Sequence, residues 1–372
     1  MIKAPVSLWC ATAIAGSLMV ASAGAMADPQ YIIRLNNFKI FDTTSPHTDT
    51  DYVYFTARVG DQVFGPMHVG LGDLNNGVFY LNWEFGPVTI IDNTKVAISY
   101  QIVNNGTADQ QKQLANDAQI AGTIGNVITG GGSILDVFVP GAAPIASAIG
   151  QLVKQIGDGI KSIGGLIDCD EVVVSDALGT DGAQIRQWLV PAGYHTEVRD
   201  YHTPGRPGPF CRDAHYVVSW SVLPSYVRID NRNSKLSMDV ADASLLDGAA
   251  VNQFTTHNGA NQRWRLVPVD PVEIPNSMVI VSVNSSKALD VPNGSHDSGV
   301  FIQQYSLHKG PNQRWRFIPF QDNQSVQIIN ENSELALDVP SLSTTPGTGI
   351  QQYQPNPGLN QQWVIVPSPV SP

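Results

Sequence analysis

The stretch Asn312-Gln-Arg-Trp315 has two close copies in the same chain, Asn261-Gln-Arg-Trp264 and Asn360-Gln-Gln-Trp363. An Asp-Val pair lies 22 residues before the Asn of each copy, and the three anchoring residues are Asp239, Asp290 and Asp338. These anchors are 51 and 48 residues apart. Three copies with the same internal spacing predict a threefold repeat of one supersecondary unit.

Two further positions agree between the copies. Thirteen residues after the anchors stand Asn252, Gln303 and Gln351, and fifteen residues after them stand Phe254, Tyr305 and Tyr353. A single unit of about 45 residues cannot bury its own apolar face. Three units around a pseudo-threefold axis can, because together they close a small barrel beneath a cap of hairpins. We therefore expect the three Trp side chains in a shared core, and the Gln of each Gln-x-Trp in hydrogen bonds within its unit.

This repeat resembles the ricin-type β-trefoil lectin domain, and we place that domain at residues 225–367. The resemblance implies a shallow sugar pocket in each unit, built from the Asp, the Gln-x-aromatic segment and the Asn before Gln-x-Trp. Such side chains suit a sugar because carboxylates and amides pair with hydroxyls, while an aromatic ring covers the apolar sugar face. Galactose-type glycans are the ligands that the resemblance implies.

The implied carbohydrate-binding residues form two intact sets and one altered set. They are Asp290, Gln303, Tyr305 and Asn312 in the second unit, Asp338, Gln351, Tyr353 and Asn360 in the third, and, as a weaker or lost site, Asp239, Asn252, Phe254 and Asn261 in the first. The first unit departs from the pattern because it has Asn for Gln and Phe for Tyr. Replacing Asp290 and Asp338 by Ala is expected to abolish glycan binding and to leave the thermal midpoint nearly unchanged.

The first 27 residues have the pattern of an export signal. Lys3 precedes an apolar stretch that is short for a bilayer span, and Ala25-Met-Ala27 forms an A-x-A cleavage site. The alternative is an uncleaved anchor. Cleavage predicts a secreted or periplasmic protein and leaves two cysteines, Cys169 and Cys211. A disulfide is the simplest expectation in an exported chain, against a metal pair or free thiols.

The charge of the chain disfavours two classes of partner. Residues 28–372 carry 20 basic and 32 acidic side chains, a net charge of −12. Neither phosphate neutralisation on nucleic acid nor electrostatic docking on anionic lipid suits such a chain. A neutral glycan fits better. We therefore expect membrane contact through glycoconjugates or, as an alternative, through the helical segment described next.

Residues 28–223 predict a second, β-rich domain, so the whole chain is expected to be mainly β. Short runs of β-branched and aromatic residues between Gly, Pro, Asn and Asp indicate a β-sandwich-like fold. Apolar positions at 3–4 residue spacing within 107–167 predict an inserted helical hairpin. Strand-like pieces then resume, among them Ile185–Val190, and the domain boundary is expected near Pro224.

The N-terminal domain offers one candidate metal site and no catalytic motif. Asp42, Asp49, Asp51 and Asp73 lie in acidic loops that would supply oxygen ligands for Ca²⁺, although Asp and Asn are also ordinary turn residues. The lectin domain itself requires no cofactor. His195 and His202 flank Glu197 and Asp200 in what we interpret as a solvated surface loop.

Three functions are consistent with this organisation. A carbohydrate-binding protein is favoured. The alternatives are a lectin-targeted toxin or pore-forming protein that uses residues 116–167, and a glycoside hydrolase or other secreted enzyme with an appended binding module. Dye release from glycolipid vesicles would identify the pore former, and release of reducing sugar would identify the hydrolase.

Overall fold

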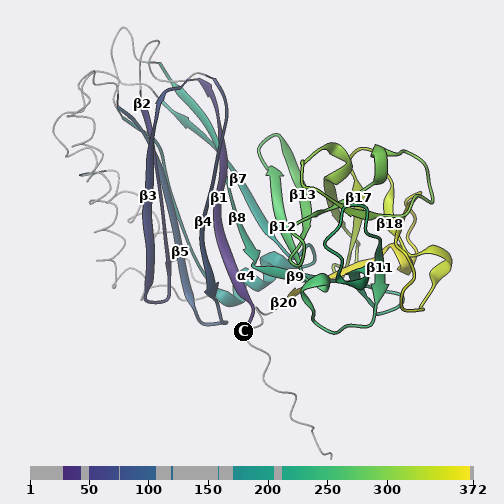
Figure 1. Cartoon of the computed structure of the whole chain (residues 1–372). Helices are drawn as coiled ribbons and strands as arrows, with labels where there is room; N and C mark the ends of the chain where they lie inside the picture. Colours follow the sequence, from purple (N-terminus) through teal and green to yellow (C-terminus); the bar gives the residue numbers. More distant parts are fainter. Residues whose placement is uncertain are drawn as a thin grey trace, which may run out of the picture.

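The structure is a computed structural model, and it describes residues 28–42, 50–74, 76–105, 119, 158, 171–204 and 212–368. The described residues form two β-rich domains that lie side by side (Figure 1). The first domain contains β1 (Gln30–Asp42), β2 (Thr50–Val59), β3 (Gln62–Asp73), β4 (Gly77–Thr89), β5 (Lys95–Asn105), β6 (Glu171–Asp181), α4 (Gly182–Leu189), β7 (His195–Thr203) and β8 (Ala214–Pro224). The mainly β fold predicted from the sequence is confirmed.

The N-terminal domain is a sandwich of two antiparallel four-stranded sheets. One sheet has the order β4-β1-β8-β7, and the other has the order β3-β2-β5-β6. Side chains from both sheets form one buried core, including Phe38 of β1, Phe55 of β2, Ile98 of β5 and Trp220 of β8. Alternating burial along long strands is the pattern of sheets that face each other across such a core.

The segment from Ile185 to Leu189 belongs to helix α4, and Val190 is the extended residue that caps it, which corrects the strand expected over Ile185–Val190. Asp181 caps helix α4 by accepting a hydrogen bond from the backbone N–H of Gln184 at 2.9 Å. Ile185 and Leu189, one helical turn apart, are both buried. Local capping thus prevails over the strand propensity of the β-branched residues.

Two strands were missed by the sequence interpretation. Glycine and proline in β3 obscure the strand pattern, and Gly65 has a φ of 88° at a position where a Cβ would lie 2.7 Å from the Phe55 carbonyl oxygen. The expected surface loop around His195 and His202 is instead the edge strand β7. Its inward positions are polar, because Arg199 pairs with Asp176 of β6 at 3.2 Å, so no apolar alternation marks it.

The expected helical hairpin at 107–167 lies outside the described residues except at positions 119 and 158, which are both helical and exposed. Cys169, Cys211 and residues 1–27 also lie outside them. The disulfide and the export signal therefore stay predictions. In the part of the chain that the structure describes, no helix is long and apolar enough to span a bilayer.

The C-terminal domain is the predicted β-trefoil. Its elements are β9 (Tyr226–Asn231), β10 (Ser237–Val240), η1 (Ala241–Ala243), β11 (Val251–Phe254), η2 (Ala260–Gln262), β12 (Trp264–Asp270), β13 (Ile274–Ser282), β14 (Ala288–Asp290), η3 (Pro292–Gly294), β15 (Gln303–Tyr305), η4 (Pro311–Gln313), β16 (Trp315–Pro319), β17 (Val326–Asn330), β18 (Ala336–Asp338), η5 (Pro340–Leu342), β19 (Gln351–Tyr353), η6 (Leu359–Gln361) and β20 (Trp363–Ser368). Six strands close a barrel in the order β9-β12-β13-β16-β17-β20, and β20 returns to β9. The hairpins β10–β11, β14–β15 and β18–β19 supply one cap element per unit.

The three repeated Trp residues fill the barrel core, as the repeat predicts. Trp264, Trp315 and Trp363 are fully buried. Each indole N–H donates to the backbone carbonyl oxygen of the residue just before its anchoring Asp, at 3.1–3.2 Å. Each Trp therefore ties the barrel to the cap hairpin of its own unit and satisfies its only polar atom at the same time.

A second buried residue joins each unit to another. The amide nitrogen of Gln304 donates to the carbonyl oxygens of Ser244 and Leu246 in the first unit, at 2.8 and 3.0 Å. Gln352 does the same to the second unit, and Gln253 to the third. Because the three links run around the axis, every unit both gives and receives one. These contacts explain how a cysteine-free trefoil holds its three units together.

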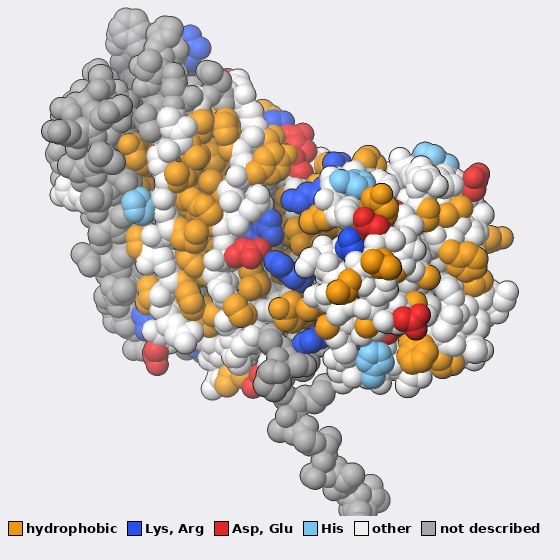
Figure 2. Space-filling view, in the orientation of Figure 1, with side chains coloured by type: hydrophobic (Ala, Val, Ile, Leu, Met, Phe, Trp, Pro, Cys, Tyr) orange, Lys and Arg blue, Asp and Glu red, His pale blue; other side chains and the backbone are white. Residues whose placement is uncertain are grey.

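The two domains meet along a polar and apolar junction. Asn37 of β1 donates to Asp270 of β12 at 2.7 Å, and the Tyr80 hydroxyl donates to the same carboxylate. Figure 2 shows basic and acidic side chains gathered along this junction, where Lys39 pairs with Glu273. Asp270 is buried, and its carboxylate receives hydrogen bonds from side chains of the N-terminal domain. The junction is therefore a specific contact between the two domains and not a loose linker.

The Tyr80 contact predicts a pH dependence of the junction. Its hydrogen bond to Asp270 raises the pKa of Tyr80 to about 12. The contact therefore stabilises the junction fully below pH 10 and is lost as the pH rises from about 10 to about 12. Burial also raises the pKa of Tyr31, Tyr100, Tyr194 and Tyr201. Tyrosinate absorbance should therefore show several phenols titrating late in the native chain, and one fewer near pH 12 in Tyr80→Phe. Identical titration curves for the two chains would contradict this contact.

Candidate functional site

Asp290 is the centre of a converging set of polar side chains in the second unit. It ends β14 and is 2 % exposed. Its Oδ1 accepts from the Gln303 amide at 2.8 Å, and its Oδ2 accepts from Asn312 at 2.9 Å and from Gln313 at 3.0 Å. The hairpin register places Gln303 directly opposite Asp290. Backbone pairing and three amide donors thus hold one carboxylate in a single orientation.

This carboxylate lies at the floor of an open pocket of about 380 Å³. Tyr305, which is 42 % exposed, and His308 line the pocket with their ring centroids 6.5 Å apart and their planes inclined at 66°. Asn293 and Gly294 also line it, in a left-handed turn with φ of 54° and 61°. The pocket therefore combines an exposed aromatic face with fixed hydrogen-bonding groups, which is the arrangement that a polyhydroxylated ring requires.

The third unit repeats the same polar geometry. Asp338 accepts from Gln351 at 2.8 Å, from Asn360 at 2.6 Å and from Gln361 at 3.0 Å. Tyr353 is 44 % exposed at the position of the second unit's tyrosine. Its rim differs, because Leu342 stands where the second unit has glycine and presents an exposed side chain.

The first unit is altered as the sequence indicated. Asn252 is shorter than Gln, and its buried Oδ1 has no hydrogen-bond partner among the described residues. His257 Nε2 lies 3.3 Å from the Asp239 carboxylate, closer than the 3.7 Å between His308 and Asp290 in the second unit, and Asn261 donates to Asp239 at 2.9 Å. Burial raises the pKa of the Asp239 carboxyl above its ordinary value. The first pocket consequently lacks the glutamine amide that donates to the aspartate in the other two pockets, and it has phenylalanine in place of their tyrosine.

A family model for ricin-type beta-trefoil lectin-like domains matches the chain in three overlapping segments, residues 214–305, 272–353 and 311–370. The C-terminal domain belongs to this family. The matched segments together contain all three anchoring Asp residues and all three Gln-x-Trp motifs. The lectin-like domain is therefore confirmed, and the residues described above occupy the positions that the resemblance assigned to the sugar pockets.

Several solved structures are similar to this chain. A designed threefold-symmetric protein, ThreeFoil, is 38 % identical over 38 % of this chain and 98 % of its own, with a TM-score of 0.36. An exo-β-1,3-galactanase from Clostridium thermocellum is 17 % identical over 73 % of this chain, which spans 55 % of that enzyme, with a TM-score of 0.36. A Macrolepiota procera ricin B-like lectin, solved with lactose, is 20 % identical over 38 % of this chain and 94 % of its own, with a TM-score of 0.33. No curated protein matches the chain.

Three pocket positions in the lectin-like domain escaped the sequence interpretation. His308 lies 18 residues after its anchor and has counterparts in His257 and Asn356, so the repeat itself contained the signal. The turn residues Asn293 and Gly294 lie three and four residues after the anchor. Their counterparts differ in type between units, which hides them from a search for identical residues.

The buried state of the anchors changes one expectation. Asp290 and Asp338 each hold three amide groups, so their removal leaves buried donors without an acceptor. Alanine at these positions should lower stability as well as binding. The nearly unchanged thermal midpoint expected from the sequence is therefore withdrawn. Exposed Tyr305 and His308 are cleaner probes of the pocket.

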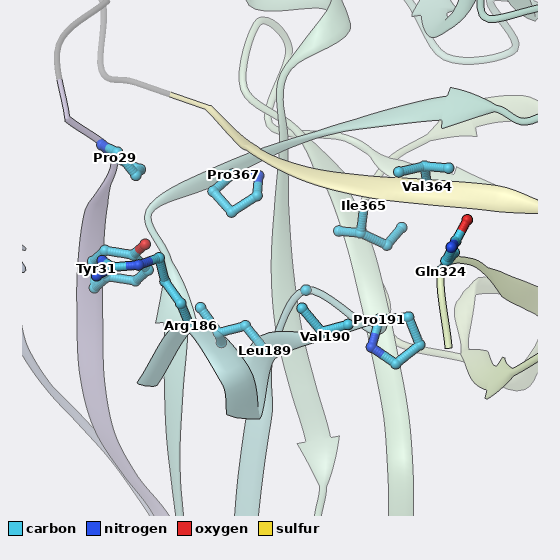
Figure 3. A pocket seen from close by; sticks show the side chains of 11 residues that line it. Pro29, Tyr31, Arg186, Leu189, Val190, Pro191, Gln324, Val364, Ile365 and Pro367 are labelled. Atoms are coloured by element: carbon cyan, nitrogen blue, oxygen red, sulfur yellow. The ribbon is translucent and has the colours of Figure 1, made fainter. Parts of the chain in front are cut away.

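A second pocket, of about 400 Å³, lies where α4, the start of β1 and β20 meet. Figure 3 shows Arg186 beside Tyr31 at one end and Ile365 and Gln324 at the other. Its lining is mostly proline and aliphatic side chains. Because it offers few polar groups, this pocket is chemically unsuited to a sugar and belongs to the packing between the domains.

The residues of the predicted calcium site are only partly described. Asp42 is exposed at the end of β1, whereas Asp51 of β2 is buried and accepts a hydrogen bond from the Tyr216 hydroxyl at 3.2 Å. Asp49 and the side chain of Asp73 lie outside the described residues. The hydrogen bond gives Asp51 a structural role in the sandwich, and calcium binding stays a prediction.

Proposed function

We propose that this protein is a carbohydrate-binding protein whose lectin-like domain binds glycans through the pockets of its second and third units. The observation that carries the proposal is the open second pocket, in which an oriented buried carboxylate faces an exposed tyrosine. We also propose that the chain is exported, since its leader has the pattern of a signal peptide and glycans are abundant outside cells.

The hydrogen bonds within the second pocket support a different role for each of its polar groups. The Asn312 amide uses both N–H groups on Asp290 and the Val291 carbonyl oxygen, so it positions the carboxylate and offers only its oxygen to a ligand. Gln303 uses one N–H on Asp290 and keeps the other for a sugar hydroxyl. Asp290 Oδ1 accepts one bond and can accept a second from an adjacent hydroxyl. Vicinal hydroxyls fit this pair.

Galactose-type sugars are the ligands that we propose for the aromatic side of the pocket. Galactose has an axial 4-hydroxyl, so one face of its ring presents a continuous C–H surface that suits Tyr305. Such a ring contact contributes about 0.5–1.5 kcal/mol beyond area burial when two aromatic groups meet, and we expect a comparable term here. Glucose presents its hydroxyls equatorially and should bind more weakly.

Removal of the Tyr305 ring should weaken the second pocket without destabilising the fold. In a Tyr353→Ala background, which weakens the third pocket so that the second dominates, Tyr305→Ala is expected to weaken lactose binding by about 10-fold, since a loss of 1.4 kcal/mol is a factor of ten. The ring is 42 % exposed, so the thermal midpoint should stay the same. Isothermal titration with lactose measures the effect.

Phe254→Ala is the matched control, because Phe254 holds the same position in the altered first unit and is 41 % exposed. Made in the same background, it should leave lactose affinity unchanged. Equal weakening by Tyr305→Ala and Phe254→Ala would assign the effect to the first unit or to the fold and would contradict the proposed second pocket.

A further inference from the structure

Three potential metal ligands converge on the outer face of the N-terminal sandwich, away from the sugar pockets. Asp200 and His202 are two residues apart on β7, so their side chains lie on the same face of the sheet. The pairing of β7 with β8 places His215 directly opposite His202. The ligand atoms of all three lie within 4.8 Å of one another. We propose that Asp200, His202 and His215 form a binding site for a divalent transition metal ion of the zinc or copper type.

The distances suit such an ion. Asp200 Oδ1 lies 2.8 Å from His215 Nε2 and 3.5 Å from His202 Nε2. Ligands at 2.0–2.1 Å from zinc in tetrahedral geometry are about 3.3–3.4 Å apart, so side-chain rotations alone close the site. Two imidazoles and one carboxylate form a borderline ligand set that prefers Zn²⁺ or Cu²⁺ over Ca²⁺ or Mg²⁺, which require more oxygen ligands.

The surroundings bring the two imidazoles together on one face of the sheet, and each ring has to rotate about its side-chain bonds to point a nitrogen at the ion. The His202 and His215 rings are stacked with centroids 4.0 Å apart, and Phe41 of β1 stacks on the other side of His215 at 4.4 Å. His215 is the least exposed of the three side chains, at 25 %, while Asp200 and His202 are 59 % and 70 % exposed. The ion would therefore be bound from the strand surface, with its remaining coordination position open to water or to an external ligand.

A structural alternative exists for the same residues. The His215–Asp200 contact alone would be a hydrogen bond across an edge strand, and it needs neither His202 nor a metal ion. The metal site needs three side chains to bind one ion, whereas the hydrogen bond needs only two side chains and no ion. A metal site loses affinity when any one of the three ligands is removed, whereas a hydrogen bond between two residues gives no metal affinity at all.

Calorimetric titration of the chain with Zn²⁺ tests the proposal. We expect one ion per chain at this site, and at least a tenfold loss of affinity in Asp200→Asn, His202→Ala and His215→Ala. His68→Ala is the matched control, since His68 lies on β3 in the other sheet and should leave Zn²⁺ affinity unchanged. In a Ca²⁺ titration, the measured heat should be the same for the native chain and for the three variants, because Ca²⁺ should not bind to these residues.

Electron paramagnetic resonance of the Cu²⁺-loaded chain gives a second readout. Two imidazole nitrogens should couple to the metal in the native chain, and one should remain in His202→Ala. All three residues lie at the strand surface, so circular dichroism should show native folding in every variant. Absence of Zn²⁺ binding at 100-fold molar excess, or Zn²⁺ affinity unchanged by all three substitutions, would overturn the proposal.

Discussion

Trp315→Ala is expected to lower the free energy of unfolding of the lectin-like domain by about 3–5 kcal/mol, the range measured for large aromatic residues removed from cores. The side chain is fully buried in the barrel, and its indole N–H donates to the Leu289 carbonyl oxygen at 3.1 Å. Alanine therefore creates a cavity in the shared core and leaves a buried carbonyl oxygen without its donor. One substitution should weaken all three units because they share that core.

Urea denaturation followed by circular dichroism measures this loss. Leu246→Ala is the matched control, since Leu246 lies in the same domain but is 73 % exposed, and its removal should change stability by no more than about 0.5 kcal/mol. A loss below about 1 kcal/mol for Trp315→Ala would mean that the tryptophan does not fill a closed barrel, which would contradict the trefoil core described here.

Asp290→Ala is expected to weaken binding in the second pocket by about 10- to 100-fold, because hydrogen bonds to a charged group contribute about 1.5–3 kcal/mol. The same change removes the acceptor of Gln303, Asn312 and Gln313. Leaving buried donors unpaired should reduce the free energy of unfolding by about 1–3 kcal/mol. Binding and stability should therefore fall together at this position.

The matched control is Asp247→Ala in the same Tyr353→Ala background. Asp247 is a solvent-exposed carboxylate that pairs with Lys287 and lies outside the pocket, so lactose affinity should not change. Lactose titration gives the affinity, and the thermal midpoint, measured on the same samples, shows the accompanying stability loss. Unchanged lactose affinity in Asp290→Ala would remove the carboxylate from the site.

The repeat made the C-terminal fold predictable because each repeated residue has one geometric task. The Trp residues fill the core and the Asp residues organise the amides, so their spacing encodes both barrel and pocket. The inter-unit links of Gln253, Gln304 and Gln352 were equally regular in the sequence but were not interpreted. The rims of the pockets were harder to predict from the repeat, because the equivalent positions 294 and 342 hold different residues, Gly294 and Leu342.

The N-terminal domain was less predictable, because its decisive contacts join residues far apart in the chain. Strand β3 contains turn-forming residues and is stabilised by pairing with β2. Strand β7 owes its inward polar residues to ion pairs such as Arg199 with Asp176. His202 and His215 are neighbours only because β7 pairs with β8, and a scan of local spacing does not detect such cross-strand pairs.

Glycan-array binding of residues 28–372, with and without calcium, tests the central claim most directly. The native chain should bind glycans with terminal galactose-type residues, and Tyr305→Ala combined with Tyr353→Ala should weaken that binding by at least about tenfold while the chain remains folded. A folded native chain that binds no glycan, or a double variant that binds as well as the native chain, would contradict the claim that these two pockets make the protein a lectin.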